Sequence, residues 1–245
     1  YEWVAEFSGY EARLVPLTID YRFDAAAMLK AVDERTKIIF VCNPNNPTGT
    51  YWNTEQLRRF LDQVDGRQIV VLDEAYSEFV EAADFPNGME LLREYPNLVV
   101  FRTFSKMFAL AALRIGYLAS GKEVVDVIRR TCVAYSVNAL AQQAAQGALA
   151  DAEQQIGRTR RMVREARSFL HEELTRLNLP HTLGEGNYMV VRLPMSDTLA
   201  YRKLMAQGIM VRTMTGFRFP NHIRVTLGTL PVMEKFVEAL KNIMT

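Results

Sequence analysis

The chain has 245 residues, of which 49% are hydrophobic and 23% charged, a composition typical of globular proteins with a substantial core. Its formal net charge of +1 gives no general electrostatic attraction for nucleic acid or for an anionic membrane, so we expect small molecules and other protein chains as partners. No apolar run approaches the roughly 18 residues of a membrane span, and two cysteines are too few for a disulfide framework, which together favour a cytoplasmic protein.

The first half of the chain alternates short apolar runs with amphipathic segments. In chain order, the predicted elements are a helix at 1–7, a strand at 13–17, a helix at 24–33, a strand at 37–42, a helix at 54–64 capped by Thr54, a strand at 69–72, a helix near Met89, and strands at 98–101 and 115–119. Because the strands are apolar on both faces and separated by helices, they predict a mostly parallel sheet covered on each side. We therefore predict a three-layer α/β/α large domain over residues 1–150. Its abrupt, helix-like start indicates that it is incomplete at the N-terminus.

The second half has a different pattern. Its predicted elements are helices at 123–133, 138–150 and 153–177, strands at 188–193, 210–212 and 223–227, and helices at 198–207 and 232–243. We read residues 151–245 as a long connecting helix and a smaller α+β domain. The basic run at 158–164 is followed by glutamates, which indicates a solvated helix face rather than a nucleic-acid patch.

Polar clusters follow three of the predicted strands. They lie at 43–49, 73–76 and 103–106. In open α/β sheets, ligands bind at the carboxyl ends of the strands, so we expect the three clusters to form one site.

Lys106 lies among hydroxyl side chains just after a predicted strand, and Arg114 follows eight residues later. An amine forms an imine with a carbonyl group, and hydroxyls together with a guanidinium bind a dianionic phosphate. The segment therefore suits a phosphorylated aldehyde held covalently. Taken alone, it fits a surface turn with ordinary charges equally well.

Asp73 follows a buried strand, where a carboxylate is costly unless it meets a cation or a hydrogen-bond donor. A pyridine nitrogen would serve, because the carboxylate keeps it protonated and makes the ring an electron sink, and Tyr76 could bind the ring's phenolic oxygen. The alternative is that Asp73 caps a helix and Tyr76 packs. In the turn at 43–49, two prolines fix the backbone around an exposed amide, although a tight loop without chemistry has the same composition.

Together these motifs resemble the fold type I, pyridoxal-phosphate-dependent class I/II aminotransferases. The turn Asn-Pro-Asn-Asn-Pro-Thr-Gly, then Asp-Glu-Ala-Tyr, then Ser-Lys and the arginine eight residues on occur in the order and at the spacing of that family. Within it, the segments Asp-Glu-Ala-Tyr-Ser-Glu-Phe at 73–79 and Arg-Thr-Phe-Ser-Lys at 102–106 most resemble the histidinol-phosphate aminotransferase subgroup.

The resemblance assigns cofactor roles by position. Lys106 would bond covalently to pyridoxal 5'-phosphate and, once substrate displaces it, carry the proton from the substrate Cα. Asp73 would pair with the pyridine nitrogen, and Tyr76 and Asn46 would bind the ring's 3' oxygen. The cofactor phosphate would be held by Thr103, Ser105 and Arg114.

The resemblance also assigns substrate roles, and this sequence differs from the family at some positions. Arg224 would bind the substrate carboxylate through its bidentate fork, Arg212 would assist with a substrate phosphate, and Asn187 occupies a substrate-facing position. Ala112 stands where the family usually has glycine, which reduces backbone freedom there. The family's glycine-containing phosphate loop, its substrate-covering segment and a tyrosine lent by the neighbouring subunit are not in this sequence.

The resemblance implies a transaminase of histidine biosynthesis that exchanges amino groups between histidinol phosphate and 2-oxoglutarate, works as a homodimer and acts on amino acids and keto acids. An aromatic amino-acid aminotransferase or a threonine-phosphate decarboxylase of the same subgroup are alternatives. A third is a non-catalytic, cofactor-sensing domain of a transcription regulator. We predict no metal site, because the three histidines lack metal-ligand spacing.

Overall fold

A computed structural model describes residues 1–244 and contains two sheets. The larger sheet has the order β1 (Ile38–Cys42), β2 (Ile69–Asp73), β3 (Leu98–Thr103) and β4 (Gly116–Ser120). The first three strands are parallel and β4 is antiparallel to β3, which confirms the predicted mostly parallel sheet. The two central strands, β2 and β3, carry the longest buried runs, whereas no residue of the edge strand β4 is buried.

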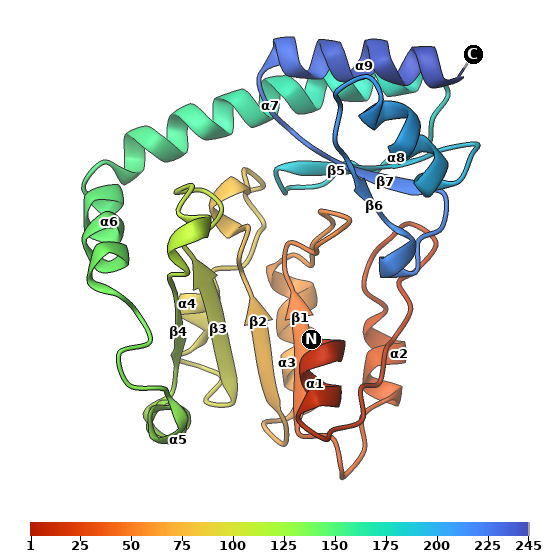
Figure 1. Cartoon of the computed structure of the whole chain (residues 1–245). Helices are drawn as coiled ribbons and strands as arrows, with labels where there is room; N and C mark the ends of the chain where they lie inside the picture. The colour runs from red at the N-terminus through yellow and green to blue at the C-terminus, as the bar shows by residue number, and fades with distance from the viewer. Residues whose placement is uncertain (245) are drawn as a thin grey trace.

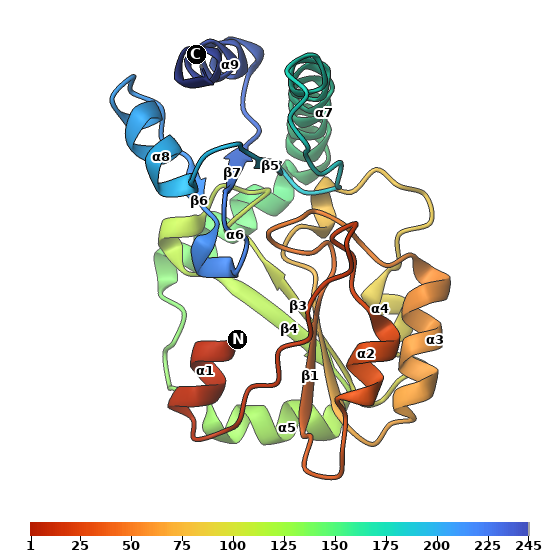
Figure 2. The ribbon, with the colours of Figure 1, turned by 90° about the vertical axis from the view of Figure 1, so that its right-hand side faces the viewer.

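Helices flank both faces of this sheet. On one side lie α2 (Ala25–Lys30), α3 (Thr54–Val64) and α4 (Gly88–Leu91), and on the other lies α1 (Glu2–Phe7) (Figure 2). The buried face of α3 packs with the apolar side chains of β1, β2 and β3 into one core cluster. α5 (Lys122–Thr131) contacts β4, and α6 (Ala139–Ala150) then leads away from the sheet.

The long helix α7 (Ala152–Arg176) runs from the region of the large sheet to the small one (Figure 1). The small sheet has the order β5 (Tyr188–Arg192), β7 (His222–Thr226) and β6 (Arg212–Thr213), and all its pairs are antiparallel. α8 (Asp197–Met205) and α9 (Leu230–Met244) complete this part. A second core cluster joins α7, α9 and the small sheet, and it also takes in Tyr76, Phe79 and Met107 from the first half of the chain.

Two local predictions were wrong. Residues 13–17 form no strand, because this segment has no neighbouring strand to pair with and the Arg13 side chain instead binds Asp33 and the Ala31 carbonyl beyond the end of α2. Asn53 rather than Thr54 caps α3, since Asn53 and Gln56 form a reciprocal capping box. Thr54 is already helical, and both its main-chain N–H and its hydroxyl bind the Asp84 carbonyl.

Candidate functional site

The carboxyl ends of β1, β2 and β3 lie side by side. In the register of the sheet, Asp73 at the end of β2 stands between Cys42 on β1 and Phe101 on β3. The three polar clusters of the sequence therefore emerge at one edge of the sheet, as predicted (Figure 1). What each cluster contributes depends on the local contacts of its side chains.

Asp73 is partly buried, and each of its carboxylate oxygens has a donor. Oδ1 accepts from the Ala75 N–H at 3.0 Å, and Oδ2 accepts from the hydroxyl of Tyr1. The Tyr1 ring stacks on Phe40 with the centroids 4.1 Å apart. A ring with a donor group thus lies against the carboxylate that was predicted to face a pyridine nitrogen, and Tyr1 is a contact that the sequence did not reveal.

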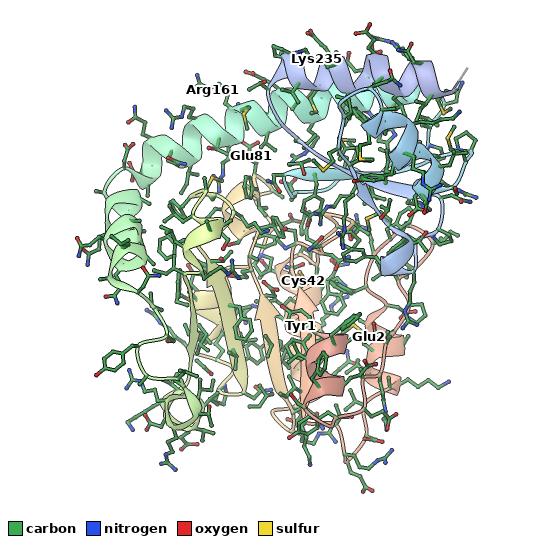
Figure 3. All side chains as sticks on the ribbon, in the orientation of Figure 1. Tyr1, Glu2, Cys42, Glu81, Arg161 and Lys235 are labelled. Carbon is green, nitrogen blue, oxygen red and sulfur yellow. The ribbon has the colours of Figure 1, made fainter. Side chains whose placement is uncertain are left out.

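Two groups near Asp73 have raised pKa values. Burial, followed by the nearby Asp73 carboxylate, raises the pKa of the Cys42 thiol to about 12. The same two causes raise the pKa of the Tyr1 phenol, in that order, so its hydroxyl stays protonated as a donor. Cys42 is the last residue of β1, and Tyr1 lies beside this strand (Figure 3). Neither group is suited to act as a nucleophile at neutral pH.

Lys106 and Tyr76 face one another across the site. The Lys106 Nζ is 5.4 Å from the centroid of the Tyr76 ring, whereas the ring itself is buried. Within residues 1–244, Lys106 makes no ion pair and its side chain is exposed, so its amine is free to meet a ligand. The Tyr76 ring packs edge-to-face on Tyr188, with centroids 5.0 Å apart.

The predicted phosphate-binding residues lie on the connection between β3 and β4. Thr103 pairs with Gly116 across the two strands, and its Oγ1 accepts from the Ser105 N–H at 3.0 Å. Arg114 ends a 3-10 turn over Ala111–Leu113 in the left-handed conformation, φ 54°, and among the described residues its guanidinium donates only to the Ala111 carbonyl. The segment from lysine to arginine is therefore a folded loop rather than two turns of a helix. It brings two hydroxyls and a guanidinium onto one connection.

Asn46 belongs to a turn that is held rigidly from within. Asn43 exchanges two hydrogen bonds with the Trp52 backbone, at 2.8 and 3.0 Å, and Asn45 binds the Thr48 hydroxyl at 2.8 Å. These bonds occupy the neighbouring amides. The Asn46 side chain is left to face the small sheet.

Arg224 reaches this turn from β7. Its Nη1 donates to the Asn46 Oδ1 at 2.5 Å, its guanidinium lies 5.0 Å from the centroid of the Tyr188 ring, and its buried Nε has no partner among the described residues. The Tyr188 hydroxyl donates to the Asn45 carbonyl at 2.8 Å. Tyr188 thus connects the small sheet to the turn, a contact that no sequence pattern indicated beyond the position of Tyr188 after Asn187.

The two remaining substrate candidates are placed differently. Arg212 on β6 is the register partner of Arg224 on β7, so the two side chains share one face of the small sheet. Asn187 is held through its main chain, whose carbonyl accepts from the Leu227 N–H at 2.8 Å. No contact joins its side chain to the other candidates among the described residues.

This donor set suits a phosphorylated pyridine aldehyde. A carboxylate at the end of β2 matches a ring nitrogen, the free amine of Lys106 matches an aldehyde, and the Ser105 hydroxyl with the guanidinium of Arg114 matches a phosphate. The buried Nε of Arg224, which has no acceptor among the described residues, is a further donor that an anionic ligand could use.

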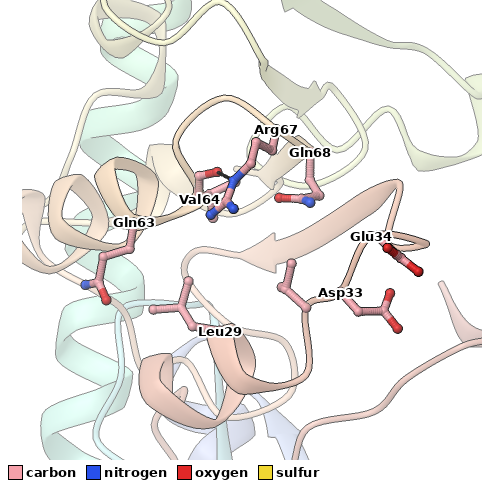
Figure 4. Close-up of a pocket in the computed structure, with 8 residues that line it drawn as sticks. Leu29, Asp33, Glu34, Gln63, Val64, Arg67 and Gln68 are labelled. Atoms are coloured by element: carbon pink, nitrogen blue, oxygen red, sulfur yellow. Dashed lines mark hydrogen bonds between the residues drawn. The ribbon is translucent and has the colours of Figure 1, made fainter.

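One hollow of the described chain lies away from these residues. A hollow of about 490 Å³ lies between α2 and α3, lined by Leu29, Val64 and Gln68 among others (Figure 4). It is near the amino ends of β1 and β2, opposite the site. Residues 1–244 contain neither a cluster of three metal-ligating side chains nor a helix long and apolar enough to span a membrane.

Comparison with known proteins gives consistent matches. The family described as aminotransferase class I and II matches residues 1–240. Histidinol-phosphate aminotransferase 2 of Pseudomonas fluorescens is 40% identical over 244 residues, which is 100% of this chain and 65% of that protein. The chain therefore spans about two thirds of the length of this relative.

Solved structures share the fold. The histidinol-phosphate aminotransferase of Clostridium acetobutylicum superposes with a TM-score of 0.92 at 24% identity and covers 100% of this chain and 74% of that one. The enzyme of Sinorhizobium meliloti in complex with pyridoxal-5'-phosphate gives 0.86 at 24% identity, with 99% and 67% covered. Since the family match extends over nearly the whole sequence, this chain belongs to the class I and II aminotransferases.

Proposed function

We propose that the protein is a pyridoxal-phosphate-dependent transaminase that exchanges amino groups between histidinol phosphate and 2-oxoglutarate, a step of histidine biosynthesis. The 40% identical relative is named histidinol-phosphate aminotransferase 2, and the solved structure with pyridoxal-5'-phosphate supports the cofactor. The proposed cofactor and the proposed substrate rest on different residues. Those at the edge of the large sheet concern the cofactor, and those on the small sheet concern the substrate.

One arrangement carries the proposal. The Lys106 amine lies against the Tyr76 ring, that ring packs on Tyr188, and Tyr188 in turn lies against the guanidinium of Arg224. Two packed tyrosines therefore connect the Lys106 amine with the anion-binding guanidinium of Arg224. A substrate that reacts beside Lys106 through its amino group could place its anionic group at Arg224.

The register of the small sheet favours a substrate with a phosphate. Arg212 and Arg224 are neighbours across β6 and β7, so two guanidinium groups can face one ligand. A carboxylate needs one guanidinium fork, whereas a phosphate dianion is bound better by two. Glutamate and histidinol phosphate could thus use the same cationic pair in the two halves of the reaction.

The residues of the chain divide the chemistry between them. When bound, the cofactor supplies an electron sink that stabilises negative charge at the substrate Cα. The Asp73 carboxylate would keep the proton on the ring nitrogen, and Tyr76 with Asn46 would orient the ring through its 3' oxygen. The Lys106 amine would accept the proton from the substrate Cα and pass it to C4′ of the cofactor. Thr103, Ser105 and Arg114 would hold the phosphate.

An absorbance spectrum of the full-length protein with cofactor tests the first part. We expect a visible band that borohydride reduction fixes on Lys106, that added glutamate removes, and that Lys106→Ala abolishes. A cofactor-supplemented, intact protein without such a band would contradict the catalytic role of Lys106.

Substrate profiling tests the second part. Histidinol phosphate, phenylalanine and phosphothreonine would be compared at equal concentration with 2-oxoglutarate as acceptor. Turnover of histidinol phosphate supports the proposal. Preference for phenylalanine would assign an aromatic aminotransferase, release of carbon dioxide from phosphothreonine a decarboxylase, and absence of any turnover a regulatory domain.

We also propose that the protein is a cytoplasmic homodimer. Trp3 and Phe7 lie one turn apart on α1 and are 72% and 85% exposed, which is unusual for large apolar side chains in a monomer. Light scattering of the full-length protein would give twice the monomer mass if these side chains contribute to a dimer.

A further inference from the structure

The buried carboxylate of Glu74 and the partly buried guanidinium of Arg102 form an ion pair beside the candidate site. The Glu74 side chain is fully buried, and its Oε2 accepts from the Arg102 Nε at 2.9 Å and from Nη2 at 2.8 Å. Its Oε1 accepts from the Gly88 N–H at 2.8 Å. Both oxygens are therefore satisfied, and the guanidinium binds edge-on with two donors.

The location of this pair is more informative than its strength. Glu74 follows Asp73 directly, and Arg102 precedes Thr103 and stands four residues before Lys106. Strands β2 and β3 are parallel here, and the Glu74 N–H donates to the Phe101 carbonyl at 2.9 Å. The ion pair thus joins the two strands at the point where each passes into a segment with proposed cofactor residues.

The surroundings leave the pair little freedom to move. A Cβ added at Gly88 would lie 2.5 Å from the Glu74 Oε1, and one added at Gly116 would lie 2.8 Å from the Arg102 carbonyl oxygen. Glycines therefore allow close packing on the carboxylate from one side and on the arginine backbone from the other. A shift of the Glu74 carboxylate toward Gly88, or of the Arg102 backbone toward Gly116, would therefore produce a steric clash.

Stability alone is a weak reason for such a pair. Burial raises the pKa of Glu74, and Arg102 opposes this rise, so the carboxylate depends on the guanidinium for its charge. Because removing two charges from water is costly, a buried ion pair contributes less to stability than apolar side chains of similar volume. Its best-supported benefit is to fix one geometry.

We propose that the Glu74–Arg102 pair is a positioning device that fixes Asp73 relative to the loop carrying Lys106, and thereby sets the geometry of the cofactor site. This inference rests on the proposed function, because it assigns the pair a role toward the cofactor. Neither residue contacts the ligand in this scheme. Both act through their chain neighbours.

The test compares two arginine–glutamate pairs in the full-length protein. Arg102→Lys keeps the charge but loses the two-donor fork, and Glu74→Gln keeps the shape but loses the charge. The matched control is Arg58→Lys, because Arg58 also binds a carboxylate with two donors, that of Glu94, with Nη2 at 2.7 Å, but lies on the exposed face of α3.

Three quantities would be measured for each variant: thermal unfolding of the cofactor-free protein, the dissociation constant of pyridoxal phosphate, and the pH midpoint of the visible band. For Arg102→Lys and Glu74→Gln we expect the dissociation constant to rise by about tenfold, the size of one lost charge-assisted hydrogen bond, and the pH midpoint to shift. Arg58→Lys should leave both unchanged.

The outcomes separate this inference from the proposed function. If the wild-type protein shows no borohydride-fixed band, the proposed function fails. If the wild type shows the band and both variants, although less stable, keep its pH midpoint and the cofactor affinity, the pair is merely structural and the inference is overturned.

Discussion

The Arg224 Nη1 donates a hydrogen bond to the Asn46 Oδ1, which joins two side chains that are 178 residues apart in the sequence. One belongs to the turn after β1 and the other to the central strand of the small sheet. The amide oxygen occupies one donor of the guanidinium, while the buried Nε stays without a partner. The arginine is thus oriented by the turn before any anion arrives.

Arg224→Lys should weaken substrate capture more than cofactor binding. An ammonium group keeps the positive charge but cannot bind a carboxylate with two parallel donors while it also contacts Asn46. We expect the KM for glutamate to rise by about tenfold or more, with a smaller change in kcat, in steady-state assays of the full-length protein. An unchanged KM would show that Arg224 does not bind the substrate, and Arg218→Lys, on the surface, serves as the control.

Tyr188→Phe tests the hydrogen bond between the small sheet and the turn. The hydroxyl of this buried side chain donates to the Asn45 carbonyl, and burial raises the pKa of the phenol, which keeps it a donor. Loss of the bond should lower the free energy of unfolding by about 1 kcal/mol, because the carbonyl keeps a second partner in the Gly49 N–H.

Urea unfolding would measure that change. The control is Tyr51→Phe, whose hydroxyl binds Asp84 at the surface and whose loss should cost less than about 0.5 kcal/mol. Equal effects of the two substitutions would contradict a special role for the Tyr188 contact.

Gly184→Ala and Gly157→Ala should change stability in opposite directions. A Cβ at Gly184 would lie 2.4 Å from the Gly49 carbonyl carbon, so the two backbones would have to separate, at a cost of about 1–3 kcal/mol. Gly157 lies within α7 and has nothing within 4 Å of an added Cβ, so alanine should stabilise the helix by about 0.5–1 kcal/mol. Thermal unfolding of both variants would show the difference, and a stable Gly184→Ala protein would contradict the close approach.

Asp33 should make stability depend on pH in a defined window. The hydrogen bond from Arg13 is the main cause that lowers the pKa of this carboxyl from 3.8 to about 2. A lowered pKa means that the stabilisation is complete above pH 3.8 and disappears as the pH falls through about 2. Wild type and Asp33→Asn should therefore differ in urea midpoint near pH 5 and converge on acidification. Curves that stay parallel down to pH 2 would refute the assignment.

The sequence predicted the sheet because its strands are short apolar runs separated by amphipathic segments, and such runs need no long-range information to be recognised. The clusters around Asp73 and Lys106 followed from the same reasoning, since polar residues at the ends of parallel strands meet at one edge. The prediction of a strand at 13–17 was wrong because strand formation requires a partner, and none is adjacent to this segment.

Side-chain pairing could not be predicted in the same way. Glu74 and Arg102 are 28 residues apart, and Arg224 is 178 residues from Asn46, so neither pair has a periodic or local pattern. The hydroxyl of Tyr1 on Asp73 also depends on how α1 lies over the sheet. Such contacts are set by tertiary packing, and the sequence alone indicates only the residues that take part.

Helix α7 has a mechanical consequence. Its 25 residues correspond to a rod of about 37 Å, and its apolar side chains belong to the same core as β5 and β7. A tilt of about 5° at one end of such a rod displaces the other end by roughly 3 Å, which is as long as a hydrogen bond. A small change in the orientation of α7 would therefore move the small sheet, with Arg212 and Arg224, relative to the large one. Substitutions where α7 is tied to the first half of the chain, as by the Arg160 bond to the Glu78 carbonyl, should thus alter substrate binding without changing any residue of the site.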